Sequence, residues 1–246
     1  MVKVPRTRAS LFATCLVDQF QPEVGEATVA VLRRLGVALD FPPDQTCCGL
    51  PLYNNGYRAE ARAIARRTIP LFAQADAVVV PSGSCAWMLK VVFPTLFPEE
   101  PRMAEQARAF AAKTFEFSDY IVSVLRVRQV PARCPGRVTY HASCHLLRGL
   151  GVSEPPRLLL RGVAGLELVE MDKADVCCGF GGSFAVKFPG VSGAIMDEKL
   201  ASIDRTGAKL VAANDAGCIL HLAGGASRRG AGVRVVHLAE ILAGGA

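Results

Sequence analysis

The stretches Thr46-Cys47-Cys48-Gly49-Leu50 and Val176-Cys177-Cys178-Gly179-Phe180 decide the fold of this chain, because each is the centre of one copy of a repeated cysteine pattern. Each adjacent pair is separated from one upstream cysteine by 31 or 32 residues and from one downstream cysteine by 36 or 39 residues. Eight of the nine cysteines thus form a first set and a second set: Cys15, Cys47, Cys48 and Cys85, then Cys144, Cys177, Cys178 and Cys218. The repeat predicts two cysteine-rich domains, residues 1–130 and 131–246.

Short apolar runs alternate with amphipathic segments in both halves. The runs predict strands at residues 10–14, 37–41, 77–80, 138–142, 167–171, 209–213 and 233–236. The amphipathic segments predict helices at residues 23–35, 57–75, 86–96, 103–113, 155–163, 191–206 and 238–242. Strands that alternate with helices form parallel sheets with right-handed crossovers. We therefore expect an α/β fold of two pseudo-symmetric repeats, each with a mainly parallel sheet flanked by helices. A linker is expected over residues 128–137, with Cys134 inside it.

The cysteines of each set follow predicted strands. In open parallel sheets, functional groups collect at the carboxyl ends of the strands. We therefore expect the four thiols of each set to meet at one end of their sheet, although they are far apart in the sequence.

Composition excludes several function classes. The net charge of +6 is spread along the chain without a basic tail, so no nucleic-acid role is expected. No apolar run is long enough to span a membrane, and the run at residues 11–17 is too short for a signal peptide. These features predict a cytoplasmic protein. Thiols are kept reduced there, so the cysteines are expected to be metal ligands or redox groups.

Three chemistries suit four convergent thiols. The first is an iron-sulfur cluster, since such clusters are held mainly by cysteine thiolates and the nearby glycines and serines can bring backbone amides close to sulfide. The second is zinc, although zinc sites usually contain short C-x2-C knuckles, which are absent here. The third is metal-free dithiol-disulfide cycling within the Cys47-Cys48 or Cys177-Cys178 pair.

The flanking segments SLFATCLVDQFQPEVG, DFPPDQTCCGLPLYNNGY, VVPSGSC, ASCHLLRGLGV and CCGFGGSFAVK add specificity. Together with the cysteine pattern, they resemble the cysteine-rich CCG domain family, and most closely its branch that serves lactate utilization. The family also includes the cysteine-rich subunit of heterodisulfide reductase and the iron-sulfur subunit of glycolate oxidase. The resemblance covers nearly the whole chain from Leu11 onward.

The resemblance implies an oxidoreductase subunit for electron transfer in an L-lactate (2-hydroxy acid) oxidising system, which converts lactate to pyruvate. It also implies partner subunits, one with ferredoxin-like iron-sulfur motifs and one accessory protein. Alternatives are a heterodisulfide or disulfide reductase-type subunit and a zinc-stabilised scaffold or regulatory subunit. The implied cofactor is an iron-sulfur cluster of the 4Fe-4S type, one or two per chain, with zinc in one site as the alternative.

The chain departs from its relatives after the last cysteine of each set. Relatives with a full motif hold a noncubane 4Fe-4S cluster and have a fifth cysteine separated from the fourth by two residues. Met88 and His221 occupy these positions here. A regular 4Fe-4S cluster, zinc in one site and a cluster with an open iron therefore remain alternatives. We interpret Met88 as a packing residue and keep His221 as a candidate ligand.

All four histidines lie in the second half. His141 and His145 flank Cys144 and are candidates either for backbone hydrogen bonding or for proton relay and cluster tuning, because imidazole titrates near neutral pH. Arg148 is a candidate for binding a carboxylate such as that of lactate. His237 is interpreted as structural. The glycines after Cys178 lack the pattern of a dinucleotide site.

Overall fold

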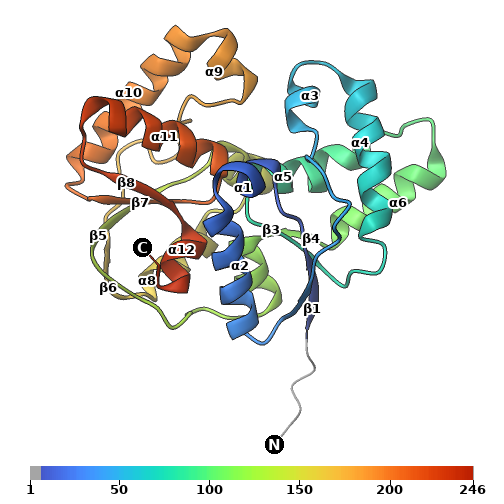
Figure 1. Ribbon diagram of the computed structural model, residues 1–246, viewed down its shortest axis with the longest axis horizontal. Helices are drawn as coiled ribbons and strands as arrows, with labels where there is room; N and C mark the ends of the chain where they lie inside the picture. Colours follow the sequence, from blue (N-terminus) through green and yellow to red (C-terminus); the bar gives the residue numbers. More distant parts are fainter. Residues whose placement is uncertain (1–6, 246) are drawn as a thin grey trace, which may run out of the picture.

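The computed structural model describes residues 7–245 and contains two four-stranded parallel sheets with the same topology (Figure 1). The order in the first sheet is β2-β1-β3-β4, and the order in the second is β6-β5-β7-β8. The first sheet consists of β1 (Arg8–Leu11), β2 (Ala38–Asp40), β3 (Val78–Val80) and β4 (Thr114–Glu116). The second consists of β5 (Arg133–His141), β6 (Ala164–Leu168), β7 (Leu210–Ala213) and β8 (Arg234–His237). The predicted α/β fold of two pseudo-symmetric repeats is confirmed.

Helices flank both sheets. The first half contains α1 (Cys15–Phe20), α2 (Pro22–Arg34), α3 (Leu50–Asn54), α4 (Arg58–Leu71), α5 (Gly83–Trp87), α6 (Pro101–Ala112) and α7 (Phe117–Asp119). The second contains α8 (Glu154–Arg161), α9 (Ser183–Lys187), α10 (Pro189–Arg205), α11 (Ala216–Arg229) and α12 (Leu238–Ala243). Short π-helical turns cover Met88–Val92, Tyr120–Val124 and His145–Gly149, and a 3-10 turn covers Phe93–Thr95.

The structure corrects several predicted boundaries. The expected linker at residues 128–137 is wrong in its second part, since β5 already begins at Arg133 and Cys134 lies within this strand. Pro135 is tolerated because the pairing of β5 with β6 shifts register between Arg133 and Gly136. The strand predicted at residues 167–171 lies earlier, at β6. Strand β4 and helix α11 were not predicted.

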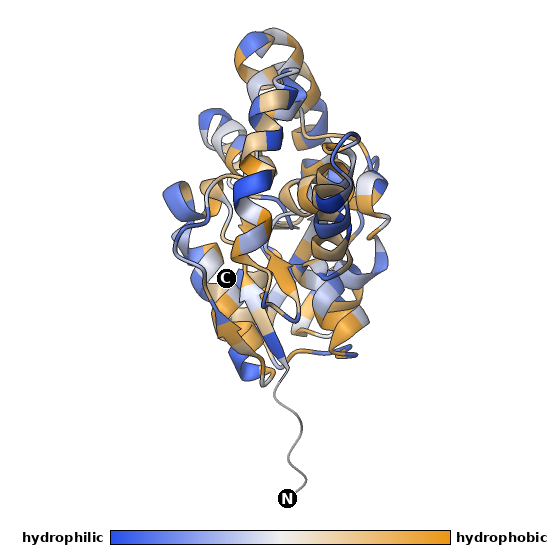
Figure 2. Cartoon of the chain, turned by 90° about the vertical axis from the view of Figure 1, so that its right-hand side faces the viewer, coloured by the Kyte–Doolittle hydropathy of each residue, from blue (hydrophilic) through white to orange (hydrophobic). Residues whose placement is uncertain are grey.

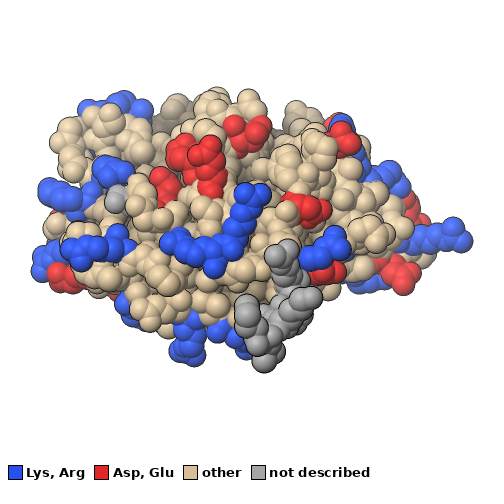
Figure 3. Space-filling view, turned by 60° about the horizontal axis from the view of Figure 1, so that its bottom comes forward, with Lys and Arg blue, Asp and Glu red and all other residues tan. Residues whose placement is uncertain are grey.

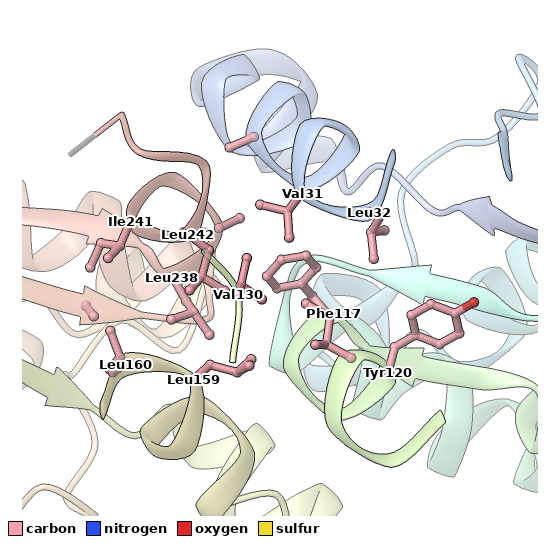
Figure 4. Close-up of a cluster of buried hydrophobic side chains, with 14 of the residues drawn as sticks. Val31, Leu32, Phe117, Tyr120, Val130, Leu159, Leu160, Leu238, Ile241 and Leu242 are labelled. Atoms are coloured by element: carbon pink, nitrogen blue, oxygen red, sulfur yellow. The ribbon is translucent and has the colours of Figure 1, made fainter. Parts of the chain in front are cut away.

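One hydrophobic core is shared by the two halves (Figure 4). Val31 and Leu32 of α2 pack in the same cluster as Leu159 of α8 and as Leu238 and Leu242 of α12. Helix α12 lies beside α2 (Figure 1). Each fully buried leucine or valine contributes about 1.5–3 kcal/mol, so this cluster holds the halves together. The division of the chain at residue 130 stays a prediction.

Hydrophilic residues are spread over the helices and loops at the surface (Figure 2), whereas β3 and β7, next to the centre of each sheet, contain only apolar residues. On the face drawn in Figure 3, Lys and Arg side chains are interspersed with Asp and Glu side chains and do not gather into one patch. Within residues 7–245, no helix is both long enough and apolar enough to cross a membrane.

Candidate metal centre

A single cavity of about 260 Å³ is lined by all eight cysteines of the two sets. Its wall is built by the segments that follow the carboxyl ends of β1, β3, β5 and β7, together with the loops that carry the two adjacent cysteine pairs. The sequence predicted that each set gathers at the end of its own sheet. The structure adds that the two sets face the same cavity.

The isolated cysteines of each set lie where a strand passes into a helix. Cys15 is the first residue of α1, Cys85 lies in α5, and Cys218 lies in the first turn of α11. Cys144 directly precedes the π-helical turn that starts at His145. Unpaired backbone N–H groups and the helix dipole favour negative charge at such positions. The fold therefore places these four sulfurs at the starts of helical segments, on the wall of one cavity.

The glycine that follows each cysteine pair has a specific backbone role. Gly49 and Gly179 have φ angles of +85° and +94°, a conformation that residues with a side chain rarely adopt. This conformation turns each glycine N–H back toward the first cysteine of the pair. The N–H of Gly49 lies 3.4 Å from Sγ of Cys47, and that of Gly179 lies 3.3 Å from Sγ of Cys177.

The thiols of the first set form close pairs. Sγ of Cys15 lies 3.5 Å from Sγ of Cys47, and Sγ of Cys48 lies 3.3 Å from Sγ of Cys85. Hydrogen bonds from the thiols of Cys15 and Cys48 lower the pKa of Cys47 to about 3, and the same contacts raise the pKa of Cys15 and Cys48. The first set therefore concentrates negative charge on the first sulfur of its pair.

The second set repeats this arrangement. Hydrogen bonds from Cys144 and Cys178 lower the pKa of Cys177 to about 2. The pKa of Cys144 and that of Cys178 are both raised, chiefly by the hydrogen bond to Cys177. The two sets thus have matching electrostatics as well as matching sequence spacing.

The donor atoms suit a thiophilic metal group. All nine cysteines are free thiols, and Cys48, Cys85, Cys178 and Cys218 are buried. Four sulfurs that converge in a partly buried site match the ligands of iron-sulfur clusters and of zinc. Several small residues line part of the wall and leave room for backbone amides to approach: Ser82, Ser84, Gly181, Gly182 and Ser183.

The histidine and arginine candidates have different surroundings. His145 lines the cavity, with Nδ1 3.8 Å from Sγ of Cys144 and its ring 4.7 Å from that of Trp87. His221 is not among the cavity residues; its Nε2 lies 3.3 Å from Oγ of Ser192. Arg148 is exposed and donates to the carbonyl of Asp175, away from the cavity. The structure therefore brings His145 to the thiols and leaves His221 and Arg148 outside.

His141 is completely buried at the end of β5. Its side-chain nitrogen and the sulfurs of Cys178 and Cys218 all lie within 4.8 Å of one another. Burial lowers the pKa of His141 to about 3, so the imidazole is neutral. Sequence analysis grouped His141 with the second set but did not predict this contact with the second and fourth cysteines.

Met88 and His237 are both interpreted from the sequence as structural residues. Met88 is fully buried in the hydrophobic cluster around Phe93 and Leu89, as expected of a packing residue. His237 caps α12, because its Nδ1 accepts a hydrogen bond from the N–H of Ala239. Both residues are structural.

Sequence analysis missed Asp215, which lines the cavity and caps α11. Its carboxylate accepts hydrogen bonds from the hydroxyl of Ser82 and the N–H of Ser84 in the other half. Asp215 precedes Cys218 by three residues, as Ser82 precedes Cys85. Aligning the two copies could have revealed this pair as equivalent helix caps.

Comparison with known proteins agrees with the geometry. The family model for the cysteine-rich CCG domain matches residues 9–90 and 138–223. The chain is 48% identical over 235 residues to lactate utilization protein A of Geobacillus thermodenitrificans, with 96% of this chain and 98% of that relative covered. The chain belongs to the lactate utilization protein A branch of the CCG domain family. The Bacillus subtilis member of this branch is 44% identical, over 96% of this chain and 98% of its own length.

A solved structure shares the fold of this CCG protein at low sequence identity. It is a hypothetical protein from Helicobacter pylori, with a TM-score of 0.66 and 9% identity. The match covers 97% of this chain and 48% of that one. The likeness concerns the fold alone.

Proposed function

We propose that this chain is a cytoplasmic iron-sulfur subunit that transfers electrons in a system oxidising L-lactate to pyruvate. The observation that carries the proposal is the convergence of eight free thiols on one cavity. Zinc sites usually contain short C-x2-C knuckles, which this sequence lacks, so the adjacent cysteine pairs favour an iron-sulfur group over zinc.

Residues of the chain prepare the cavity for a negatively charged group with sulfur ligands. Cys47 and Cys177 are held as thiolates by neighbouring thiols and by the N–H of the following glycine. Helices α1, α5 and α11 begin beside the cavity, and the residues that cap their first turns, Thr14, Ser82 and Asp215, line it. When bound, an iron-sulfur cluster supplies one-electron transfer.

Membership of the lactate utilization protein A branch supports lactate as the source of the electrons. Oxidation of lactate to pyruvate releases two electrons and two protons. An electron-transfer subunit therefore needs one partner that donates electrons to it and another that accepts them. We propose a subunit with ferredoxin-like iron-sulfur motifs and an accessory subunit as these partners. His145 lines the cavity and is our candidate for moving a proton there. Arg148 donates to the carbonyl of Asp175 outside the cavity, so we assign it no contact with the lactate carboxylate.

Metal and sulfide analysis of protein purified without oxygen tests the cofactor. We expect brown protein with about four irons and four sulfides per occupied set. Cys48→Ser and Cys178→Ser should each lower the iron content of one set. Cys134→Ser is the matched control, because Cys134 is buried like Cys48 but lies away from this cavity.

Other outcomes would contradict the cluster. Colourless protein with stoichiometric zinc would favour a scaffold or regulatory subunit. Colourless, metal-free protein with reducible Cys-Cys pairs would favour disulfide reductase chemistry. Growth of a deletion strain tests the pathway: we expect loss of growth on L-lactate and normal growth on glycolate and glycerol. Normal growth on lactate would contradict the proposed substrate.

A further inference from the structure

The two cysteine sets differ at one matched position. Phe12 lies three residues before Cys15, and His141 lies three residues before Cys144. Both side chains are completely buried where the first strand of their half ends. Phe12 belongs to the same hydrophobic cluster as Cys48 and Cys85. The first half therefore has an apolar ring where the second half has an imidazole.

The two ring nitrogens of His141 are buried polar atoms. Within residues 7–245, neither Nδ1 nor Nε2 of His141 has a hydrogen-bond partner. Buried polar groups are nearly always hydrogen-bonded, and an unpaired one is costly unless another group satisfies it. A phenylalanine already fills the equivalent space in the first half, so packing alone does not require histidine here.

The surroundings of His141 point to a metal. A nitrogen of His141 and the sulfurs of Cys178 and Cys218 lie within 4.8 Å of one another, close enough for one metal group to bind all three. The neutral imidazole is the form that coordinates metals. Soft thiolates together with an imidazole suit iron and zinc, whereas magnesium and calcium require oxygen ligands.

We propose that His141 is a ligand of the metal group held by the second cysteine set, whereas the first set binds through thiolates alone. This inference rests on the proposed function, since it assumes an iron-sulfur group in the second set. The two sites are then chemically different despite the repeat. A neutral imidazole adds no negative charge to a cluster, and iron-sulfur centres with histidine ligands have higher reduction potentials than those with cysteine alone.

A buried lysine lies near the second set as well. Lys199 is only 2% exposed, and burial lowers its pKa, whereas the nearby Cys178, Asp175, Cys177 and Cys218 act in the opposite direction and favour its charged form. A buried ammonium favours the more negative, reduced state of a neighbouring cluster. We therefore expect the second site to be reduced before the first, so that electrons pass from the first set toward the second.

Pulsed electron paramagnetic resonance of the reduced, anaerobically purified full chain tests the ligand. The protein is prepared with ordinary histidine and with 15N-histidine. We expect a strong coupling from one directly bound histidine nitrogen, which changes with the isotope. His141→Phe, which copies Phe12, and His141→Cys, which keeps a metal-binding side chain, should both abolish it. His145→Phe and His221→Phe should retain it.

The outcomes separate this inference from the proposed function. If wild-type protein contains iron and sulfide but shows no strong histidine coupling, His141 is not a ligand and the electron-transfer function stands. A coupling that disappears in His221→Phe instead also overturns the inference. Wild-type protein without iron and sulfide would overturn the proposed function and, with it, this assignment. The wild-type spectra decide the first and third cases. If a His141 variant fails to fold, the His145→Phe and His221→Phe spectra still assign the nitrogen, and loss of the coupling in either one overturns the inference.

Discussion

The hydroxyl of Ser82 donates a hydrogen bond to Oδ2 of Asp215 over 3.0 Å and thereby joins the caps of α5 and α11 across the two halves. Each residue lies three positions before the last cysteine of its set. The same oxygen accepts from the N–H of Ser84 at 2.9 Å, and the N–H of Gly83 donates to the carbonyl of Asn214 at 2.9 Å. These bonds hold the two cysteine sets next to each other.

Asp215→Ala should destabilise this junction. The substitution removes an acceptor for Ser82 and Ser84 and the cap of α11, so we expect the free energy of unfolding to fall by about 2 kcal/mol. Urea unfolding under reducing conditions measures the change. Asp204→Ala, on the exposed side of α10, is the control and should change stability by less than about 0.5 kcal/mol. Equal effects of the two substitutions would contradict the structural role of Asp215.

Gly179→Ala should damage the second cysteine pair. Gly179 has a φ of +94°, and a Cβ there would lie 2.5 Å from the backbone oxygen of Ser192. We expect a loss of roughly 1–3 kcal/mol in unfolding free energy and less iron in the second set. Gly193→Ala is the matched control within α10, where the added carbon would meet no described atom within 4 Å apart from its chain neighbours and the nearby backbone of its own helix. That control should gain up to about 1 kcal/mol, and a neutral Gly179→Ala would show that the turn tolerates a side chain.

Glu116 should make stability fall as pH rises. Burial raises the pKa of Glu116 to about 7 from 4.5, although Asn214 and Ser118 donate hydrogen bonds to it. Between these pKa values the folded state binds more protons than the unfolded state, so stability decreases from about pH 4.5 to about pH 7 and then levels off. The change is roughly 3 kcal/mol.

Glu116→Gln removes this titration. The difference in unfolding free energy between wild type and Glu116→Gln, measured in urea from about pH 5 to pH 8, isolates it. Glu105→Gln on the exposed face of α6 is the control and should follow the wild-type curve. If Glu116→Gln also runs parallel to wild type, Glu116 does not titrate in this range.

His237 should make stability fall as pH decreases, the opposite of the effect of Glu116. Burial lowers the pKa of His237 from 6.5 to about 4, and its neutral Nδ1 caps α12 by accepting from Ala239. The contribution of His237 to folding stability is therefore complete above 6.5, the pKa in the unfolded state, and is lost as pH falls toward about 4. His237→Asn keeps an acceptor at the cap without titrating. Thermal unfolding followed by circular dichroism measures the effect. We expect the stability of His237→Asn to fall less than that of wild type between about pH 6.5 and pH 4.5. Equal losses in the two proteins would refute the assignment.

Local patterns in the sequence determined the fold class, the two repeats and the two sets of four cysteines. Strand and helix periodicity is a property of neighbouring residues, and the spacing of the cysteines relative to the strands indicates which sheet edge they reach. The sequence also marks the glycine of each CCG motif as a special backbone position. It does not reveal that the N–H of this glycine donates to Sγ of Cys47 or Cys177.

Only the tertiary structure decided that both sets face one cavity and that His141, not His221, lies beside Cys178 and Cys218. These relationships depend on how the halves pack through α2 and α12 and on the junction at Asp215. Such contacts join residues far apart in the chain, and no local periodicity encodes them. The physical reason is that hydrophobic burial is non-directional, so the partner of each apolar face is selected by the shape and polar bonding of the whole core.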